Sequence, residues 1–402
     1  MQTLAIVGAS LAGISAARAV RAQGFCGRLL IIGDEPHRPY DRPPLSKDFL
    51  AGKLHGDHLF LEAPGIGPDA EPLQAEWILG AKAVRLDAAS RTVTLSDGRA
   101  VQADGLVIAT GASARTLPEL AGLDNVFTLR TLEDAQDLAP ELLPGGRLVI
   151  VGAGFIGAEV ASTARALGME VTVICSSSVP LAGPLGAEMG AVMARLHGLN
   201  GVELVCDASI HSYYSGEGNV TGIRLDGGRY LPADVVLVAI GAEPNIAWLA
   251  GSGLELGDGV LCDAMGRTSI PGVVAVGDCA AWWDERSGRH HRVEHWSAAA
   301  ERPALAVSAV LDPAAPQRPV SLPYFWSDQY NVKLQFAGHA READRVAIEA
   351  GDPAEHSFLA VYYRGADPVA VLGANQPRLF TRWRRQLNAV AAGAAGNLVP
   401  SP

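Results

Sequence analysis

The sequence is poor in the features that mark a disulfide-bonded or membrane-spanning protein. Its 402 residues include only 5 cysteines, which are scattered and contain no CxxC pair. This odd, dispersed set predicts a reducing compartment rather than a disulfide framework. The apolar N-terminus lacks the basic start of a signal peptide, and no uninterrupted apolar run is long enough to span a bilayer. We therefore expect a soluble, cytoplasmic protein.

Positive charge is also scarce, because 43 acidic residues outnumber 32 lysines and arginines and give a net charge of −11. A protein that binds nucleic acid needs a concentrated positive surface. The sequence also lacks an acid–base triad, a metal-ligand cluster and a phosphate-transfer loop. His290 and His291 are neighbours in the chain, and adjacent residues rarely point the same way, so a basic surface patch is favoured there over a metal site. We expect no nucleic acid, no membrane and no bound metal.

Glycine, in contrast, is abundant, and an early group forms a loop between two buried strands. Apolar runs at 4–7 and 29–32 predict parallel strands, and an alanine-rich stretch to about Gln23 predicts a helix between them. In a GxGxxG loop the first glycine makes the turn, the second lets the backbone approach a pyrophosphate, and the third allows helix-on-strand packing. The loop here contains Gly8, Ser10, Leu11, Ala12 and Gly13.

This first loop predicts a dinucleotide site, since free N–H groups and the dipole at a helix N-terminus favour an anion. Ser10 replaces the second glycine; its side chain crowds the pyrophosphate but adds a hydroxyl donor, so we consider it tolerable. The acid expected about twenty residues beyond the third glycine is present as Asp34, with Glu35 beside it. Either carboxylate can accept hydrogen bonds from ribose hydroxyls.

A second glycine loop follows a predicted strand at 147–151 and opens another helical stretch. It contains Gly152, Gly154, Phe155, Ile156 and Gly157. This duplication, separated by roughly 145 residues, predicts two nucleotide-binding domains in one chain. The strand at 170–174 is followed by Cys175 and serines, so the ribose-binding acid is missing, and no arginine is placed for a 2′-phosphate. The choice between NADH and NADPH therefore stays open.

Further strands complete the pattern and lead to a different C-terminal region. A hairpin is predicted around 93–98, and strands at 106–108 and 273–276 precede glycines. Beyond about Pro316 aromatic residues gather and the Rossmann pattern ends, which predicts an α+β domain closing with an arginine-rich helix near Thr381. Pro303 lies inside the helix expected after Trp296 and should kink or end it.

The segment Pro39–Lys47, after the first βαβ unit, resembles the FAD-dependent ferredoxin reductases of bacterial oxygenase systems. The resemblance covers essentially the whole chain. It extends to the blocks at 109–111, 129–134, 152–159, 276–278, 294–297 and 325–329.

The resemblance implies an α/β chain of the glutathione-reductase type, with two Rossmann-like domains and a C-terminal α+β domain. The expected boundaries are 1–110 with 243–318 for FAD, 111–242 for NAD(P)H and 319–402 for the C-terminal domain. It also implies FAD and NADH as cofactors, with NADPH not excluded. Electrons would pass from NADH through FAD to a [2Fe-2S] ferredoxin that feeds a Rieske-type aromatic-ring dioxygenase or a cytochrome P450. A monomer or a homodimer is expected.

Residue by residue, the resemblance implies that Lys47 and Glu159 form a catalytic pair beside the flavin and nicotinamide rings. A surface lysine and a first-turn helix carboxylate are the structural alternatives. Asp278 would accept hydrogen bonds from the flavin's ribityl chain or cap a following helix. Trp326 would cover the ring system or pack in a core. The other cofactor-binding residues implied are Arg42, Ala83, Ala109, Thr110, Gly111, Arg130, Gly241, Gly277, Glu294, His295 and Trp296.

The residues from 33 to 53 contain no cysteine, so the redox-active thiols of disulfide reductases and of single-cysteine peroxidases of this fold are absent. The electrons must then leave the flavin directly, which suits a one-electron acceptor. Reduction of rubredoxin or another acceptor stays an alternative. So does an apoptosis-inducing-factor-like binding flavoprotein, although that class typically carries long basic insertions that this acidic chain lacks. The arginines at 289, 292, 378, 382, 384 and 385 are candidates for docking the partner.

Overall fold

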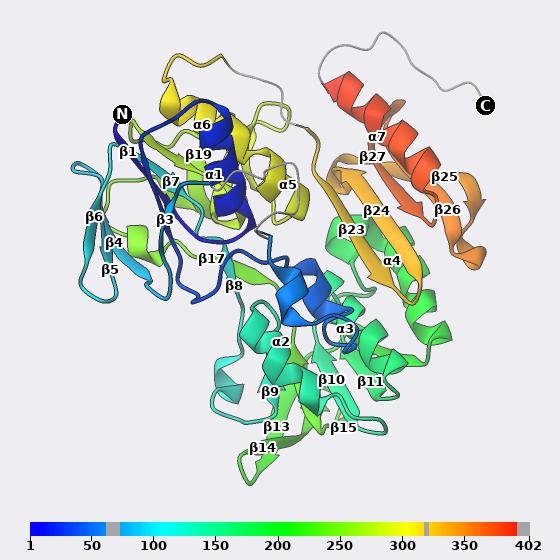
Figure 1. The fold of residues 1–402 in the computed structure, drawn as a ribbon. Coiled ribbons are helices and arrows are strands. Elements are labelled where there is room, and N and C mark those ends of the chain that lie inside the picture. Colours follow the sequence, from blue (N-terminus) through cyan, green and yellow to red (C-terminus); the bar gives the residue numbers. More distant parts are fainter. Residues whose placement is uncertain (62–72, 317–320, 392–402) are drawn as a thin grey trace. The chain divides into compact units, whose positions relative to one another are not determined.

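A computed structural model describes residues 1–61, 73–316 and 321–391. The chain divides into two compact units, each built from several segments. Unit 1 comprises Met1–Asp41, Leu59–Ser113 and Glu243–Pro323; unit 2 comprises Arg42–His58, Ala114–Ala242 and Tyr324–Pro402. The positions of these parts relative to one another are not determined, so each unit is described by itself (Figure 1).

Unit 1 is centred on a five-stranded sheet whose order is β20-β7-β1-β2-β3. Its strands are β1 (Thr3–Val7), β2 (Arg28–Ile32), β3 (Glu76–Ile78), β7 (Gly105–Ile108) and β20 (Val273–Ala275), all paired in parallel. Leu4, Ala5 and Ile6 are fully buried, as expected where helices cover both faces of a parallel sheet. Helix α1 (Leu11–Ala22) connects β1 to β2, which confirms the predicted βαβ unit.

Two helices in the C-terminal part of unit 1 pack against α1. They are α5 (Trp296–Glu301) and α6 (Pro303–Leu311), which begins immediately after Arg302. Pro303 occupies the first position of α6, where its missing N–H leaves no hydrogen bond unmade. The break predicted at Pro303 is therefore confirmed.

Two smaller sheets complete unit 1. One contains β4 (Ala83–Asp87), β5 (Thr92–Leu95) and β6 (Ala100–Gln102), and β5 and β6 form the predicted hairpin. The other contains β18 (Leu256–Gly257), β19 (Gly259–Cys262), β21 (Ala280–Asp284) and β22 (Arg289–Arg292). The chain passes from one unit to the other in β8 (Ala112–Ala114) and β17 (Ala242–Pro244). These two strands pair as a two-stranded sheet.

Unit 2 contains a second parallel sheet of the same kind, in the order β12-β11-β10-β16-β9. Its strands are β9 (Val126–Phe127), β10 (Arg147–Val151), β11 (Glu170–Ile174), β12 (Val202–Val205) and β16 (Val235–Val238). Helix α3 (Phe155–Ala166) connects β10 to β11, and α4 (Ala182–Leu199) connects β11 to β12. The predicted duplication of the βαβ unit is confirmed. Helix α2 (Leu132–Leu138) lies between β9 and β10 in the chain. The antiparallel strands β13 (Ile210–Gly216), β14 (Asn219–Leu225) and β15 (Tyr230–Pro232) lie between β12 and β16.

The C-terminal part of unit 2 is an antiparallel sheet with one long helix beside it (Figure 1). The strands are β23 (Tyr324–Gln329), β24 (Val332–Gly338), β25 (Arg345–Asp352), β26 (Ser357–Arg364) and β27 (Asp367–Ala374), followed by α7 (Pro377–Ala391). Residues of α4, such as Leu185 and Met189, share a hydrophobic core with Phe336 and Phe358 of the sheet. This arrangement confirms the expected α+β region and joins it to the second βαβ unit.

Short 3-10 helices occupy several connections. They are η1 (Pro43–Ser46), η2 (Gly56–Leu59), η3 (Pro118–Leu120), η4 (Ala139–Glu141), η5 (Ala247–Leu249), η6 (Gly277–Cys279), η7 (Ala340–Glu342) and η8 (Pro353–Glu355). Within the described ranges, none of the helices combines the length and the apolar character needed to cross a membrane.

Candidate functional site

The first glycine loop lies at the carboxyl end of β1 and is shaped by close backbone contacts. Gly8 has a φ of +126°, and a Cβ there would lie 2.0 Å from the carbonyl oxygen of Ala109. A Cβ on Gly13 would lie 1.8 Å from the carbonyl oxygen of Gly8. Both positions therefore require glycine. Ser10, between them, occupies the N-cap position of α1 in an extended conformation that any residue adopts.

Two further predicted residues meet this loop. Gly277, which follows β20, has a φ of +72°, and a Cβ there would lie 2.8 Å from the Cβ of Ala12. This close approach brings Asp278, on η6, next to the N-terminal turn of α1. The alternative that Asp278 caps an α-helix is wrong, because η6 is followed directly by strand β21.

The acids predicted to bind ribose stand at the end of β2 in different surroundings. The Asp34 side chain is 64% exposed, and Lys82 Nζ lies 3.7 Å from its Oδ2. Glu35 accepts a 2.5 Å hydrogen bond from the hydroxyl of Tyr40. Asp34 is therefore the carboxylate accessible to a ligand hydroxyl, whereas Glu35 also orients Tyr40.

The remaining predicted residues of unit 1 occupy loop and helix ends. Thr110 donates its hydroxyl proton to the carbonyl oxygen of Asn245 at 2.7 Å, and Gly111 follows with a φ of +65°. Trp296, the first residue of α5, is 38% exposed, and its indole N–H donates to Asp41 Oδ1 at 2.7 Å. Ala83 begins β4 and is buried, Glu294 pairs with Arg292, and His295 caps α5.

The second glycine loop, in unit 2, has the same shape with one difference. Gly152 has a φ of +111°, and a Cβ there would lie 2.3 Å from the carbonyl oxygen of Ala239. A Cβ on Gly157 would lie 2.4 Å from the carbonyl oxygen of Gly152. At Gly154, the N-cap residue of α3, an added Cβ would have no described atom within 4 Å. Protein packing thus demands glycine at the first and third positions, whereas the second leaves open space at a helix N-terminus, as an anion site would.

The other residues predicted for this loop point in different directions. Ile156 is 43% exposed, whereas the centres of the Phe155 and Phe325 rings lie 4.5 Å apart. Gly241 lies in the connection between β16 and β17 and has a φ of +98°. Cys175, at the position expected for a ribose-binding acid, is buried.

Lys47 and Glu159 form an ion pair in unit 2. Lys47 Nζ lies 2.6 Å from Glu159 Oε2, and it also donates to the carbonyl oxygen of Pro43 at 2.9 Å. The side chains are 19% and 5% exposed, so the pair is largely withdrawn from water. Lys47 follows η1, while Glu159 lies in the first turns of α3, 112 residues away. The predicted pairing is present, and Glu159 is no exposed helix carboxylate.

The structure adds two serines to this pair that the sequence did not single out. Ser46 Oγ donates to Glu159 Oε2 at 2.5 Å, and Ser327 Oγ donates to Glu159 Oε1 at 2.7 Å. Ser46 is also tied to α3, because Thr163 Oγ1 donates to its carbonyl oxygen at 2.8 Å. Both serines lie inside the blocks that carry the resemblance, and this was the only signal in the sequence.

Arg42, Arg130 and Trp326 complete the predicted set in unit 2. Arg42 Nη1 donates to the carbonyl oxygen of Arg130 at 2.5 Å, and the N–H of Arg130 donates to Asp134 Oδ2 at 2.7 Å. This loop immediately precedes the capping box of α2. Trp326, on β23, is half-buried and stacks on Tyr324 with ring centres 6.1 Å apart.

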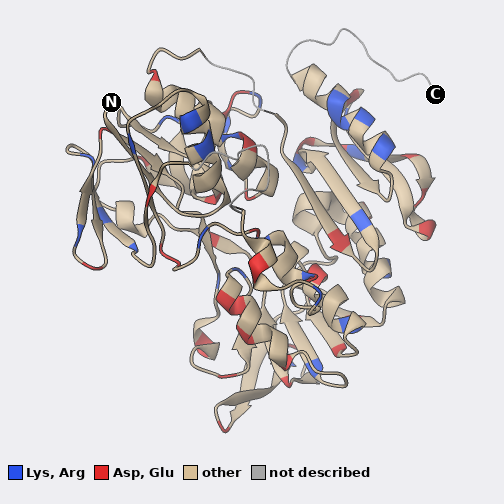
Figure 2. Ribbon diagram, in the orientation of Figure 1, with Lys and Arg blue, Asp and Glu red and all other residues tan. Residues whose placement is uncertain are grey.

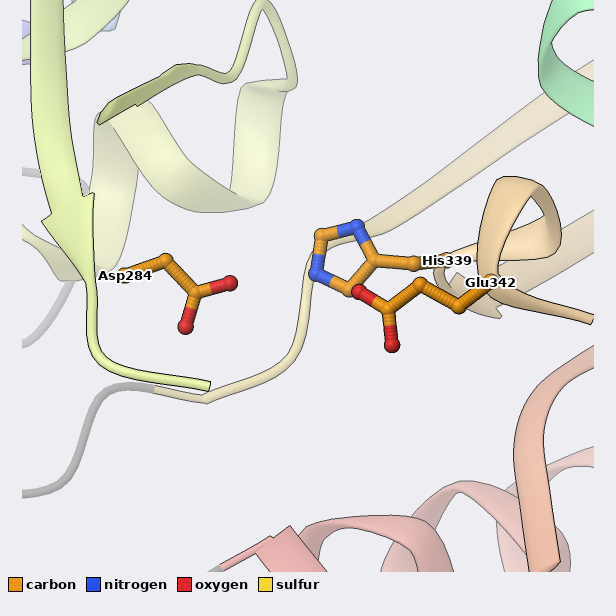
Figure 3. Close-up of side chains that lie close together, drawn as sticks. All are labelled: Asp284, His339 and Glu342. Atoms are coloured by element: carbon orange, nitrogen blue, oxygen red, sulfur yellow. The ribbon is translucent and has the colours of Figure 1, made fainter. Parts of the chain in front are cut away.

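Figure 3 draws a group of potential metal ligands that the sequence did not predict. His339 and Glu342 come from neighbouring positions at η7 in unit 2. Asp284, drawn with them, belongs to unit 1, and the two units are not placed relative to one another. Two ligands on one turn do not make a metal centre, so we assign none.

Comparison with known proteins shows similarity along almost the whole chain. Residues 2–302 match the family model described as pyridine nucleotide-disulphide oxidoreductase, and residues 324–399 match the one described as reductase C-terminal. Putidaredoxin reductase CamA of Pseudomonas putida is 35% identical, over 94% of this chain and 89% of its own. The biphenyl dioxygenase system ferredoxin–NAD(+) reductase component of Paraburkholderia xenovorans (strain LB400) is 38% identical, over 88% of this chain and 86% of its own.

The similarity extends to solved structures. The crystal structure of the covalent putidaredoxin reductase–putidaredoxin complex matches with a TM-score of 0.90 and 33% identity, covering 96% of this chain and 93% of that one. A ferredoxin reductase from Rhodopseudomonas palustris matches with a TM-score of 0.89 and 32% identity, covering 98% of each chain.

Proposed function

The chain belongs to the pyridine nucleotide-disulphide oxidoreductase family, and on that basis we propose that it is a ferredoxin reductase that takes electrons from NADH through FAD. The acceptor we propose is a [2Fe-2S] ferredoxin serving a Rieske-type dioxygenase or a cytochrome P450. The observation that carries this proposal is the largely buried Lys47–Glu159 pair together with the two glycine loops. NADPH stays open as the donor, because Cys175 stands where an acid would select NADH.

The described residues fit two dinucleotides. We assign FAD to the first loop, with Gly8 to Gly13 at the pyrophosphate, Asp34 at the ribose and Asp278 at the ribityl chain. The nicotinamide coenzyme is assigned to the second loop, where the open space at Gly154 supports an anion. Accordingly we propose domains at 1–110 with 243–318 for FAD, 111–242 for NAD(P)H and 319–402 at the C-terminus. The last of these includes residues outside the described ranges.

Lys47 and Glu159 are proposed as the catalytic residues. When bound, FAD accepts a hydride from the nicotinamide and releases electrons singly. The Lys47 ammonium is held by Glu159 at 2.6 Å and by a carbonyl oxygen, so its positive charge is fixed in position. A fixed charge in a poorly hydrated site stabilises negative charge that develops on a neighbouring group without the cost of reorientation.

No thiol is placed to take the electrons onward. The residues from 33 to 53 contain no cysteine, and Cys279, next to Asp278, is fully buried. Burial raises the pKa of the Cys279 thiol, which opposes formation of a nucleophilic thiolate. This supports direct transfer from the flavin to an outside acceptor.

The surface of the C-terminal domain offers a docking region for an acidic partner. Helix α7 carries Arg378, Arg382, Arg384 and Arg385, and Figure 2 shows blue residues spaced along it in an otherwise acidic chain. The Arg384 guanidinium also lies 4.1 Å from the centre of the Tyr324 ring. Local complementarity of this kind steers association even between two acidic proteins. The monomeric or homodimeric state and the cytoplasmic location stay predictions.

The test is a side-by-side acceptor assay on the purified holoenzyme. The extracted cofactor should be FAD, and NADH or NADPH should bleach the flavin absorbance under anaerobic conditions. Cytochrome c should then be reduced only when a [2Fe-2S] ferredoxin is added, and rubredoxin in its place should give little turnover. Turnover with rubredoxin alone, or slow flavin reduction with any nicotinamide coenzyme, would overturn the proposal in favour of the alternatives.

A further inference from the structure

The carboxylate of Glu159 accepts hydrogen bonds from two sides, and one side is the C-terminal sheet. Lys47 and Ser46 donate to Oε2, whereas Oε1 receives its hydrogen bond from Ser327 Oγ at 2.7 Å. Among the described residues Ser327 is the only donor to Oε1. Glu159 and Ser327 are 4% and 0% exposed, so water has little access to replace this contact.

A second C-terminal residue orients the serine. Gln329 lies two positions along β23, on the same face as Ser327, and its Nε2 donates to Ser327 Oγ at 3.0 Å. A serine hydroxyl has one proton, and the ionised carboxylate only accepts, so the proton of Ser327 goes to Glu159. The amide of Gln329 must therefore present its N–H to the serine. This leaves Gln329 Oε1 buried, with no hydrogen-bond partner in the described part of the chain.

An unpartnered buried carbonyl oxygen destabilises a fold and calls for an explanation. Replacing the amide with an apolar side chain of similar size would remove that penalty. The chain instead retains an arrangement that costs stability and keeps the Ser327 hydroxyl directed at Glu159.

We propose that Ser327, oriented by Gln329, is a positioning residue for the Lys47–Glu159 pair, an inference that rests on the proposed function. The terminal torsion of a glutamate is soft, so one contacted oxygen does not define the plane of its carboxylate. Donors on both oxygens define it, and the plane in turn locates the lysine ammonium. The C-terminal domain thereby contributes to oxidation of the nicotinamide as well as to binding of the acceptor.

Helix α3 and the hairpin of β23 and β24 supply a matched control. Ser162 Oγ, on α3, accepts a 2.7 Å hydrogen bond from the N–H of Tyr330, which follows β23. This hydroxyl joins the same two elements as the Ser327 contact, but it touches neither Lys47 nor Glu159. Its loss therefore reports the effect of weaker docking between α3 and the hairpin.

The experiment is anaerobic stopped-flow reduction of holoenzyme variants across a range of NADH concentrations. Ser327→Ala should lower the limiting rate constant of flavin reduction roughly tenfold, which corresponds to a small displacement of a charged group in the reacting state. The NADH concentration at half-maximal rate should stay within about twofold, because the second loop is untouched. Ser162→Ala should keep the limiting rate constant of the wild type.

Gln329→Met provides a second variant that is not expected to impair folding. It removes the unpartnered carbonyl, so its urea midpoint should equal or exceed that of the wild type. Its flavin should nevertheless be reduced several-fold more slowly, because the Ser327 hydroxyl is then free to rotate. A residue with a structural role alone would not combine unchanged or higher stability with slower reduction.

Three results would overturn the inference. These are a wild-type limiting rate in Ser327→Ala, a wild-type rate in Gln329→Met, or an equal loss in Ser162→Ala. If the wild-type holoenzyme itself is not reduced by NADH or NADPH, the proposed function fails, and the inference that depends on it fails with it. Rapid reduction of the wild type with unchanged variants would refute the positioning role alone.

Discussion

Replacing Gly154 with alanine should weaken coenzyme binding without weakening the fold. Gly154 has φ −81° and ψ −174°, an extended conformation that alanine adopts without strain. The added Cβ would have no described atom within 4 Å. Because Gly154 is the N-cap of α3 and alanine is a poorer N-cap than glycine, we expect a loss of stability of only about 0.5 kcal/mol.

The effect on binding should be larger, because the new methyl group stands in front of the free N–H groups of α3. A pyrophosphate moved outward there loses hydrogen bonds to a charged group, which are worth about 1.5–3 kcal/mol. The dissociation constant for NADH should therefore rise by roughly 10- to 150-fold. It is measured from the NADH dependence of flavin reduction, and stability is measured by urea unfolding of the same variant.

Gly157→Ala is the matched control, with the opposite expectation. Its Cβ would lie 2.4 Å from the carbonyl oxygen of Gly152 and 3.2 Å from Ile150 Cγ2, so the strand and helix would have to separate. We expect its unfolding free energy to fall by about 1–3 kcal/mol, as for overpacked cores. If Gly154→Ala bound NADH normally, or lost as much stability as Gly157→Ala, the assignment of the open space to a coenzyme would be refuted.

Three further predictions concern contacts within unit 2. Glu159→Gln should lower the unfolding free energy by about 3 kcal/mol, because it leaves the Lys47 ammonium without its charged partner in a poorly hydrated site. An unchanged midpoint of urea unfolding would contradict this prediction. Thr131→Ala removes the hydroxyl that accepts a hydrogen bond from the N–H of Asp134 at 3.1 Å. The same measurement should show a loss of about 1 kcal/mol in unfolding free energy. A loss below about 0.3 kcal/mol would show that the capping box contributes little. Burial lowers the pKa of His197 to about 4, so between pH 6.5 and 4 the unfolded chain binds a proton that the folded chain does not, and stability falls as the pH falls through this window. From about pH 7 to pH 5 the wild type should lose about 2 kcal/mol more than His197→Gln, and equal losses in urea titrations would disprove it.

The two glycine loops could be predicted from the sequence because their requirements are local. Gly8 and Gly152 have φ angles of +126° and +111°, and Gly13 and Gly157 face the carbonyl oxygens of Gly8 and Gly152 within the same strand–loop–helix. The break at Pro303 is local in the same sense, since the missing N–H belongs to that residue. Short-range sterics of this kind depend on residue type and spacing, and both can be read directly.

The environment of Glu159 could not be predicted in this way. The resemblance pointed to Lys47 and Glu159, but nothing in the spacing of the chain placed Ser327 or Ser46 on the carboxylate. In the block 325–329 the sequence predicted a role for Trp326. Because successive side chains of a strand point to opposite faces, Trp326 and Ser327 lie on opposite faces of β23. Only the packing of β23 against α3 decides which face meets Glu159.

The sequence by itself therefore determined two βαβ units with nucleotide loops, an α+β C-terminal region and the lysine–glutamate pair as candidates. The tertiary structure decided which donors hold that pair, because the contacting residues lie 168 positions apart between Glu159 and Ser327. Contacts over such separations depend on how whole elements pack, and a linear pattern carries little record of that packing.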